Sequence, residues 1–576
     1  MHSPVEKRAA GSRWGSRQCD RTSAEPSRAA DVRPAHPINN RQVKPMTLIY
    51  AKRLRGWRFI LFNVVLGLGH MIVLFNVGAY IALLPHVAGD LGGVLPSFAT
   101  WGQTYFIIAL ALAFPGARWL SGRYGDYRLF SAAFVVYALA SYLCAISQSL
   151  WLFVPARILL GFSGGITLYL GQSLMLKEYP EHLKMLGLGV WGLVTLMPFT
   201  ISFPIGGLIA DELSWRALFY LNAACAVAIA GISASLLAGR GFERNVARFD
   251  DIGFVLMALI LGSLQTILNQ GNDFDWLESP FLCSMLLVLA VSLPCFIIWE
   301  SEETHPVFNL RLFAHRNFTI GVICLAVGFL LIQGLLSVFI VQLQVLLGYS
   351  SFLAGMVYLP MILLAVPVTV AMHKLPRRLD ARLPACINLL GFSFTFYWLG
   401  LFDDPGSFDQ IFWPMLLLGF FLGSFFTPLT KLTLHGLRGG QELRAAEEAG
   451  FLRIVAGAIG ITLQGVVLFR RIPFHQLHFA EHFGGRRFAA IDVLQGFASK
   501  LQASGLDAAM VKARLLVVIR QQATLLALND AFLLASYLFL GLAGLVWLAH
   551  PTCQPLHPTL LQELGDLRAE ELMEEP

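Results

Sequence analysis

Charged residues are scarce in this sequence. Lys, Arg, Asp and Glu make up 14% of its 576 residues, 56% are hydrophobic, and the mean hydropathy is +0.64. Soluble domains carry about 25% charged residues, so this chain has too few polar groups to cover a soluble surface. Apolar runs of about 20 residues, long enough to cross a bilayer, recur along most of its length. The sequence therefore predicts an all-α polytopic membrane protein.

The patterns that mark metal sites and catalytic sites are also missing. The eight cysteines form no Cys-x-x-Cys pair or other metal-ligand spacing, and six of them lie inside apolar runs, where cysteine acts as a small hydrophobic residue. A membrane enzyme would need a cluster of His, Asp or Cys at one interface, and a channel would need charge rings or filter loops. Because neither occurs, we expect no enzyme, no cofactor and no metal.

Fourteen apolar segments are candidates for transmembrane helices. They span residues 58–84, 96–117, 129–147, 150–176, 185–209, 215–238, 252–270, 279–299, 317–341, 351–373, 383–402, 411–436, 447–468 and 529–550. Two of the gaps, between the third and fourth and between the fifth and sixth segments, are so short that an error there would change the count. Lys and Arg concentrate in every second loop, as they do on the cytoplasmic side of membranes. This alternation predicts that both termini are cytoplasmic.

Two tails flank the predicted spans. Residues 1–56 are rich in Arg, Ser and Pro and contain no apolar core, so we expect a disordered basic cytoplasmic tail rather than a signal peptide. Translation from Met46 is an equally simple alternative for this region. Residues 551–576 predict an acidic cytoplasmic tail.

One predicted loop is long. Residues 470–528 separate the last two spans and, by the charge pattern, lie in the periplasm. Segment 507–528 has the apolar spacing of an amphipathic helix that leads into the final span. His475, His478 and His482 share one helical face, and we favour a solvated face over a metal site there.

Ionisable side chains deep in the spans are candidates for function, because burying charge in lipid is costly. Arg157 lies about two turns into the fourth span, and Arg453 lies similarly in the thirteenth, after Glu447 and Glu448. His70 lies in the middle of the first span.

Amide side chains accompany these groups. They are Asn76, Gln265, Asn269, Gln333, Gln342 and Gln344. Each one alone is more often a hydrogen bond between helices than a ligand contact. Together they predict a partly polar central path.

Small residues and proline mark the end of the fifth span. Pro204 would bend the helix, and Gly206 and Gly207 would let a neighbouring helix approach closely. A static packing notch and a moving hinge are equally compatible with this spacing.

Several segments form recognisable motifs. IALLPHVAGDLG (81–92) is similar to the pattern A-L-P-x-I-A-x-D-L, and WLSGRYGDYRLF (119–130) resembles L-A-D-R-x-G-R-R-x-L-F. The motif positions are Arg123, Gly125, Asp126 and Arg128 after the second span, Arg157 and Gly161 in the fourth, Pro204, Gly206 and Gly207 in the fifth, and Trp215 and Arg216 at the start of the sixth. In their order and spacing they resemble the major facilitator superfamily, specifically its fourteen-helix drug:proton antiporters, the EmrB/QacA-like exporters.

This resemblance implies a fold and a function. The fold would contain an N-terminal six-helix bundle (57–240), two additional helices (241–305) and a C-terminal six-helix bundle (306–550) that work by alternating access. The function would be secondary active export of hydrophobic or amphipathic small molecules by proton antiport across a bacterial inner membrane. The partners would be the substrate, protons and lipid, together with a periplasmic adaptor protein and an outer-membrane channel, and no nucleic acid.

Three departures from the family pattern qualify that expectation. Asn76 replaces the usual Asp of the first helix, and Gly122 replaces the Asp of the loop motif, where Asp126 is a possible substitute. Ser202-Phe203 replaces the Gly-Pro of the fifth helix. The missing acids leave open an uncoupled or non-transporting sensor derivative of the same fold.

If the protein is proton-coupled, a side chain other than Asn76 must titrate, because an amide does not exchange a proton near neutral pH. His70 is the titratable group near mid-membrane, although a neutral histidine bonded between helices explains it equally well. The other candidates are Glu447, Glu448 and Asp530, which lie near span ends.

Overall fold

A computed structural model of the chain describes residues 54, 56–91, 96–179, 184–237, 248–372, 380–402, 408–437, 440–484, 495–496, 498–500 and 508–552. All of them belong to one unit, Ala51–Pro576. Nearly all of the two predicted tails, 1–56 and 551–576, lies outside the described residues.

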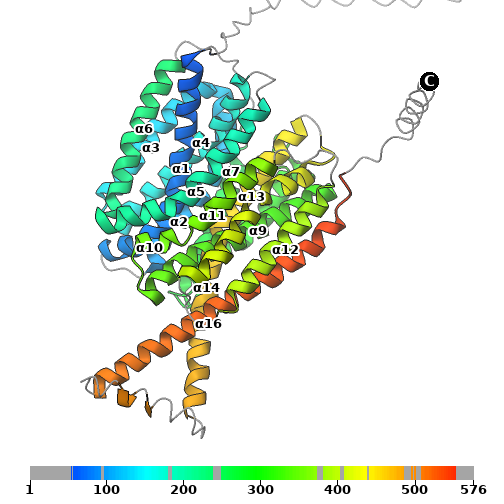
Figure 1. Ribbon diagram of the computed structural model, residues 1–576. Coiled ribbons are helices and arrows are strands. Elements are labelled where there is room, and N and C mark those ends of the chain that lie inside the picture. Colours follow the sequence, from blue (N-terminus) through cyan, green and yellow to red (C-terminus); the bar gives the residue numbers. More distant parts are fainter. Residues whose placement is uncertain are drawn as a thin grey trace, which may run out of the picture. The chain divides into compact units, whose positions relative to one another are not determined.

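Every regular element in this part of the chain is a helix (Figure 1). The amino-terminal group comprises α1 (Trp57–Asp90), α2 (Pro96–Tyr124), α3 (Asp126–Ile146), α4 (Leu150–Glu178), α5 (Lys184–Glu212) and α6 (Trp215–Leu237). The next pair is α7 (Asp251–Gln270) and α8 (Pro280–Glu302), with the 3-10 turn η2 (Trp276–Glu278) between them. The carboxy-terminal group comprises α9 (Arg316–Leu347), α10 (Ser351–Met356), α11 (Leu359–Met372), α12 (Arg382–Leu399), α13 (Phe408–Leu434), α14 (Gly440–Gly484) and α16 (Ala508–Leu545). The 3-10 turns η3 (Leu310–Ala314) and η4 (Val546–Leu548) flank this group.

The helices coincide with the predicted spans. In the described residues, 12 helical stretches are long and apolar enough to cross a membrane, and α10 with α11 forms one of them. The two remaining predicted spans are occupied by α5 and α12, of 29 and 18 residues. Both of the short gaps are true helix breaks, at 147–149 and 213–214. The prediction of an all-α polytopic fold is confirmed.

Proline does not interrupt these helices. α5 continues past Pro198 and Pro204, and α1 continues past Pro85. Within lipid, backbone groups find no water to bind, so the helical hydrogen bonds persist despite the poor propensity of proline. A polar cap starts α7, where the Asp250 side chain accepts a hydrogen bond from the Gly253 N–H at 2.9 Å.

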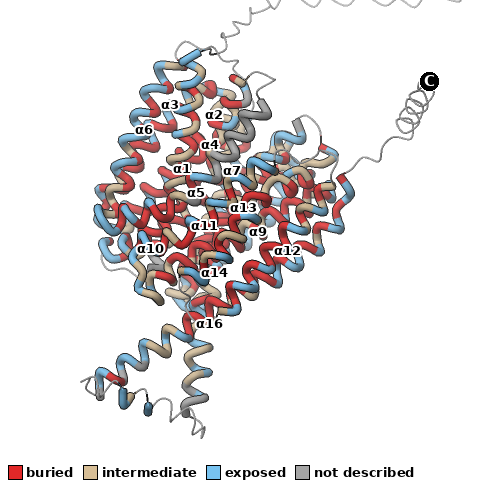
Figure 2. Tube along the Cα trace, in the orientation of Figure 1, coloured by how far each residue is buried: buried red, intermediate tan, exposed pale blue. Residues whose placement is uncertain are grey.

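Two large apolar clusters form the interior. The first gathers buried side chains of α1–α6 with parts of α7, α8 and α14. The second gathers those of α9–α14 and α16, and it includes Ile81 and Ala82 of α1 and Phe203 of α5. Buried residues follow the surfaces where helices face one another, while exposed residues follow the outer faces (Figure 2). α1, α5 and α14 therefore link the two clusters.

Helix replaces much of the predicted loop 470–528. α14 continues through Pro473 to Gly484, and α16 starts at Ala508 and runs without a break into the last span. The lower ends of both helices extend past the other helices (Figure 1). The predicted helix at 507–528 is confirmed as the first half of α16, whereas the segment after residue 470 was expected as loop and is the end of α14.

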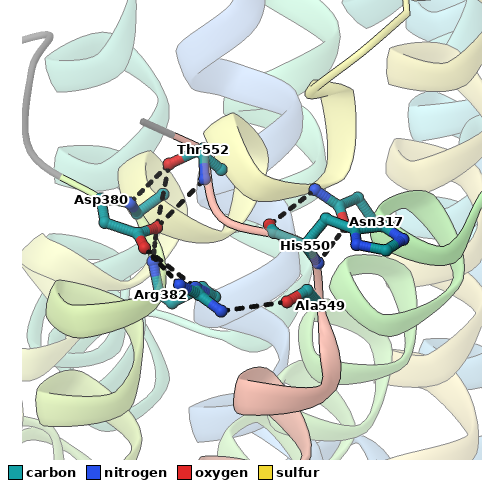
Figure 3. Close-up of polar contacts among 7 residues, drawn as sticks. Asn317, Asp380, Arg382, Ala549, His550 and Thr552 are labelled. Atoms are coloured by element: carbon teal, nitrogen blue, oxygen red, sulfur yellow. Dashed lines mark hydrogen bonds and ion pairs between the residues drawn. The ribbon is translucent and has the colours of Figure 1, made fainter. Parts of the chain in front are cut away.

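The end of the last span is fixed by a polar cluster (Figure 3). Asn317 of α9 donates to the His550 carbonyl oxygen at 3.1 Å and accepts from the His550 N–H at 2.7 Å. Asp380 accepts from the Thr552 hydroxyl at 3.1 Å and pairs with Arg382 at 2.8 Å. Partial burial alone would raise the pKa of the Asp380 carboxyl, but the hydrogen bonds from Arg382 and Thr552 outweigh it and lower the pKa to about 2.

Candidate functional site

Arg157 lies at the centre of a polar network in the amino-terminal group. Its side chain is fully buried on α4. Nε donates to the Gly102 carbonyl oxygen at 3.0 Å and Nη2 donates to Gln103 Oε1 at 2.9 Å, both on α2, while Nη1 donates to Asn76 Oδ1 on α1. The structure thus brings Arg157 and Asn76 together, and every acceptor in the network is neutral.

Aromatic rings complete the surroundings of this guanidinium. Its central carbon lies 4.2 Å from the ring centre of Tyr80 and 4.4 Å from that of Phe106. Tyr80 is itself fixed by its hydroxyl, which donates to the Ala99 carbonyl oxygen at 2.8 Å. Cation–π contacts and hydrogen bonds therefore hold one charge in a fixed position that water does not reach.

A second polar network joins three helices. Gln265 of α7 donates to Thr462 of α14 at 2.6 Å and to Asn269 at 3.2 Å. Asn269 in turn accepts from Thr462 at 2.9 Å and donates to Thr104 of α2 at 2.9 Å. The structure thus brings Gln265 and Asn269 together.

The other predicted amides lie elsewhere. Gln344 donates to the Ala82 carbonyl oxygen at 3.5 Å, across from α9 to α1. Gln342 lines a small, mostly apolar pocket with Phe339 and Phe532. Gln333 is buried on α9 in neither network. The amides that suggested a partly polar path thus lie in separate groups.

The predicted residues of α14 make three different kinds of contact. Glu447 accepts from Arg118 of α2 at 3.0 Å and from the Tyr169 hydroxyl of α4 at 3.2 Å. Glu448 is buried and accepts the Asn309 N–H at 2.8 Å. Arg453 lies over the rings of two phenylalanines.

The remaining ionisable candidates lie on α1 and α16. His70 is 8% exposed in the middle of α1. Asp530 of α16 accepts from Arg471 and His475 of α14, each at 2.6 Å. Among the described residues, no group of three or more His, Cys, Asp or Glu could hold a metal ion, and the side chain of His482 lies outside them.

The loop motif surrounds the turn between α2 and α3. Gly125 has φ +87°, a conformation that glycine adopts without strain. Asp126 is buried and contacts Ser121 and Lys177, so it ties the start of α3 to α4. Arg123 lies over the Trp119 ring at 5.3 Å and, like Arg128, is exposed.

The motif glycines lie where helix backbones meet. A Cβ on Gly161 would overlap the Phe106 carbonyl oxygen of α2, and one on Gly206 would lie 2.7 Å from Ala79 Cα of α1. A Cβ on Gly207 would overlap the Ser351 carbonyl oxygen of α10. Gly206 therefore packs within the amino-terminal group, and Gly207 packs across to the carboxy-terminal group.

Two carboxylates, Asp90 and Asp211, link helices at the same ends of the helices as Gly206 and Gly207. Asp90 accepts from Trp215 Nε1 at 2.9 Å and pairs with Arg216 at 2.5 Å. Asp211, at the end of α5, accepts the N–H groups of Ser351 and Phe352 at 3.2 and 2.8 Å. Asp211 thus caps a helix of the opposite group.

Sequence reasoning missed several of these partners, among them Gln103 and Asp211. A faint signal existed for Gln103, which lies with Thr104 inside the apolar run of α2. The sequence gave no such signal for Asp211, because carboxylates are common at the ends of membrane spans, where water reaches them.

These observations define a class. The chain is a multi-pass membrane protein with two groups of helices. The groups pack closely on each other at glycines, and charged side chains such as Arg157 are buried inside. The sequence profile described as Major Facilitator Superfamily matches residues 66–465. The chain belongs to this superfamily of transporters and is not an enzyme.

Individual relatives match nearly their whole length. The fatty acid resistance protein FarB of Neisseria gonorrhoeae is 32% identical over 88% of this chain and 98% of FarB. The multidrug export protein EmrB of Escherichia coli (strain K12) is 30% identical over 87% of this chain and 97% of EmrB.

Solved structures share the fold. A bacterial homologue of the human lysosomal transporter Spinster, in an inward-facing and unoccupied conformation, aligns with a TM-score of 0.56 at 12% identity, over 86% of this chain and 97% of that one. An autoinhibited peptide transporter of the POT family aligns with a TM-score of 0.55 at 15% identity, over 86% and 99%.

Proposed function

We propose that this transporter exports hydrophobic or amphipathic small molecules by alternating access, driven by proton influx. The observation that supports the proposal most is the match to FarB and EmrB over 98% and 97% of their lengths. Their names describe resistance to fatty acids and export of multiple drugs.

Alternating access requires contacts between two bundles that can open on one side at a time. We propose that the bundles are residues 57–240 and 306–550, with 241–305 as the additional pair. The Gly207–Ser351 contact is a candidate for the predicted periplasmic side, and the Arg118–Glu447 pair for the predicted cytoplasmic side. The other motif residues, including Asp126, Gly161, Trp215 and Arg216, would stabilise the two sides.

Proton coupling needs a group that titrates in place of Asn76. We propose His70, which is buried in the middle of α1 on the helix that carries Asn76. An imidazole binds and releases a proton close to neutral pH when its surroundings become hydrated. Glu447, Glu448 and Asp530 are the alternatives.

The test is proton flux across liposomes that contain the purified protein and a trapped pH-sensitive dye. We expect compounds that are exported to cause proton movement in the opposite direction. His70→Gln should keep the fold but make efflux independent of the pH gradient. His86→Gln, which changes an exposed histidine of the same helix, is the matched control.

Other outcomes separate the alternatives. Export without proton flux in the unaltered protein would indicate an uncoupled exporter. Neither export nor flux, with compounds still bound, would indicate a non-transporting sensor derivative. Gradient-driven export that survives His70→Gln would shift the proposal to Glu447, Glu448 or Asp530.

The proposal includes an orientation in a bacterial inner membrane, with both termini in the cytoplasm. Lys500→Cys should then react with an impermeant thiol reagent from the periplasm in intact cells. Reaction only after lysis would contradict this orientation.

We also propose a periplasmic adaptor protein and an outer-membrane channel as partners. The C-terminal part of α14 and the N-terminal part of α16 expose large apolar side chains, including Phe474, Leu477, Met510 and Leu516. Crosslinking from Leu477→Cys in cells should capture one protein that is an adaptor. Crosslinks to lipid alone would contradict this part of the proposal.

A further inference from the structure

Two buried carboxyl groups face each other where α7 begins and α8 ends. Asp250, the residue before α7, is 8% exposed, and Glu300, in the last turn of α8, is 2% exposed. A Cβ on Gly253 would overlap Asp250 Oδ2 and lie 2.6 Å from Glu300 Oε1, so these two oxygen atoms lie beside the same glycine carbon. Neither oxygen has a hydrogen-bond partner among the described residues.

The other oxygen of each carboxyl group is held in place. Asp250 Oδ1 accepts from the Gly253 N–H at 2.9 Å and from Trp299 Nε1 at 2.8 Å. Glu300 Oε2 accepts from the Phe308 N–H at 3.4 Å. Turning either carboxyl group away from the other would break these hydrogen bonds, so the two unpartnered oxygen atoms are kept close together.

No cation neutralises this pair. Among the described residues, neither Asp250 nor Glu300 forms an ion pair. Glu303 adds a further negative charge near Glu300. The nearby guanidinium groups of Arg311 in η3 and Arg444 in α14 donate to backbone carbonyl oxygens instead, at 3.5 and 3.3 Å. The other titratable or charged groups beside the pair in the chain, or on helices that contact α7, are Arg118, Arg123, Arg248, Asp251, Glu302, His305, Glu447 and Glu448. Two carboxyl groups so close together and away from water do not both ionise.

The helix ends decide which carboxyl group keeps a proton. Asp250 is the N-cap of α7, at the positive end of the helix dipole, where a negative charge is stabilised. Glu300 lies at the negative end of α8, where a negative charge is disfavoured. A proton on Glu300 Oε1 can be donated in a hydrogen bond to Asp250 Oδ2. This one proton gives both unpartnered oxygen atoms a partner.

We propose that Asp250 and Glu300 form a proton-binding site at the predicted cytoplasmic end of α7 and α8, in which the two carboxyl groups share one proton. The site belongs to the additional pair of helices and is distinct from His70, the proposed coupling group of α1. It goes beyond the proposed export function and does not depend on it. When the pH rises and the proton is lost, two negative charges remain in a buried place and repel each other.

The site is connected to α14 through segment 306–309. Glu300 holds the N–H of Phe308, and Glu448 of α14 accepts the next N–H, that of Asn309, at 2.8 Å. The Phe308 ring also lies 5.9 Å from that of Phe451 on α14. Repulsion between Asp250 and Glu300 therefore loosens this segment, so the proton site makes its packing on α14 dependent on the pH of the predicted cytoplasmic side.

The shared proton is tested by infrared difference spectroscopy on the purified full chain in nanodiscs, titrated from about pH 6 to about pH 9. A protonated carboxyl group has a carbonyl stretching band that carboxylates and amides lack. The unaltered protein should lose more of this band over the range than Glu300→Gln, by the intensity of one carboxyl group. Asp250→Asn removes the negative neighbour, so the loss from Glu300 should move to lower pH.

Glu302→Gln is the matched control, because it changes an exposed acid of the same helix turn. Its band should change with pH as in the unaltered protein. An identical loss of the band in the unaltered protein and in Glu300→Gln would overturn the proposal, and so would a loss that stays at the same pH in Asp250→Asn.

Hydrogen exchange of segment 306–309, measured by mass spectrometry and corrected for its intrinsic pH dependence, tests the connection to α14. In the unaltered protein and in Glu302→Gln, exchange should become about 10-fold faster between about pH 6 and about pH 9, which corresponds to one pH unit in proton affinity. Glu300→Gln should exchange slowly at both pH values, because its amide can donate to Asp250 as the protonated carboxyl group does. Equal acceleration in Glu300→Gln would contradict the proposal.

Discussion

The two helix groups meet by different means on the two sides of the predicted membrane. On the predicted periplasmic side, backbone touches backbone, since Gly207 packs on Ser351 and Gly355 packs on Phe203 and Pro204. On the predicted cytoplasmic side, the contact includes the long side chains of Arg118 and Glu447, which are 29% and 16% exposed. A backbone contact tolerates almost no displacement, whereas a partly hydrated ion pair adapts and contributes little.

This contrast indicates which side is harder to open. Separating α5 from α10 breaks the two hydrogen bonds that Asp211 accepts from backbone N–H groups. It also breaks the close packing at Gly207 and Gly355. Separating α2 from α14 at Arg118 exchanges an ion pair for hydrated ions. We therefore expect substitutions on the periplasmic side to have the larger effects.

The largest effect is expected from Gly207→Leu. The new side chain would occupy the space of the Ser351 carbonyl oxygen, so the two groups could not close on this side. Transport in liposomes should be abolished, while the amount of protein in the membrane is retained. Gly231→Leu on α6, where no atom lies within 4 Å of a Cβ, is the control. Transport at the unaltered rate in Gly207→Leu would show that this contact is not needed.

A smaller effect is expected from Asp211→Asn. The amide oxygen of Asn can still accept one hydrogen bond, but the charge of the carboxylate is lost. We expect this to cost about 1 kcal/mol, which is a fivefold shift between the closed and open states of the predicted periplasmic side. Ile81→Cys, buried near Phe203, should then react about fivefold faster with a thiol reagent from that side. Glu212→Gln, at the exposed neighbour, should leave the reaction rate unchanged.

Arg118→Gln should change less than Asp211→Asn. Partly exposed ion pairs contribute about 0.2 to 1 kcal/mol, so the transport rate should stay within about fivefold of the unaltered protein. Arg58→Gln, at an exposed position, serves as the baseline. Complete loss of transport in Arg118→Gln would reverse the ranking of the two sides.

The smallest effect is expected at Asp380, away from both contacts. Its pKa is lowered from the ordinary 3.8 to about 2, so its stabilisation is present above pH 4 and disappears as the pH falls from about 4 to about 2. Since the side chain is 24% exposed, we expect less than about 1 kcal/mol. Asp380→Asn should unfold at a lower temperature at neutral pH and match the unaltered protein near pH 2. Asp409→Asn, at an exposed acid, should show no such convergence.

Composition and periodicity were sufficient to predict the spans, because crossing a bilayer constrains length and hydropathy locally. They were also sufficient to single out Gly206 and Gly207 as a packing surface. They could not distinguish the two glycines. Gly206 faces Ala79 and Gly207 faces Ser351, and each contact joins residues more than 120 positions apart in the sequence.

The candidate site was predictable only in part. A buried arginine in a span must find acceptors, so Arg157 was recognisable, but its partner Gln103 belongs to another helix and was not. The pairing of Asp530 with Arg471 and His475 was hidden for the same reason, because α14 and α16 pack together over residues that read as loop. Local patterns reveal which groups need partners, and tertiary packing decides which partners they find.

The unbroken length of α16 has a mechanical consequence. Its 38 residues contain no proline and extend about 57 Å, from Ala508 to Leu545. Just beyond its end, the chain is held at Asn317, Asp380 and Arg382 (Figure 3). The second half of α16 also packs along α12 and α14, so a push on its protruding first half is passed on to these helices and to the clamp, across the thickness of the bilayer.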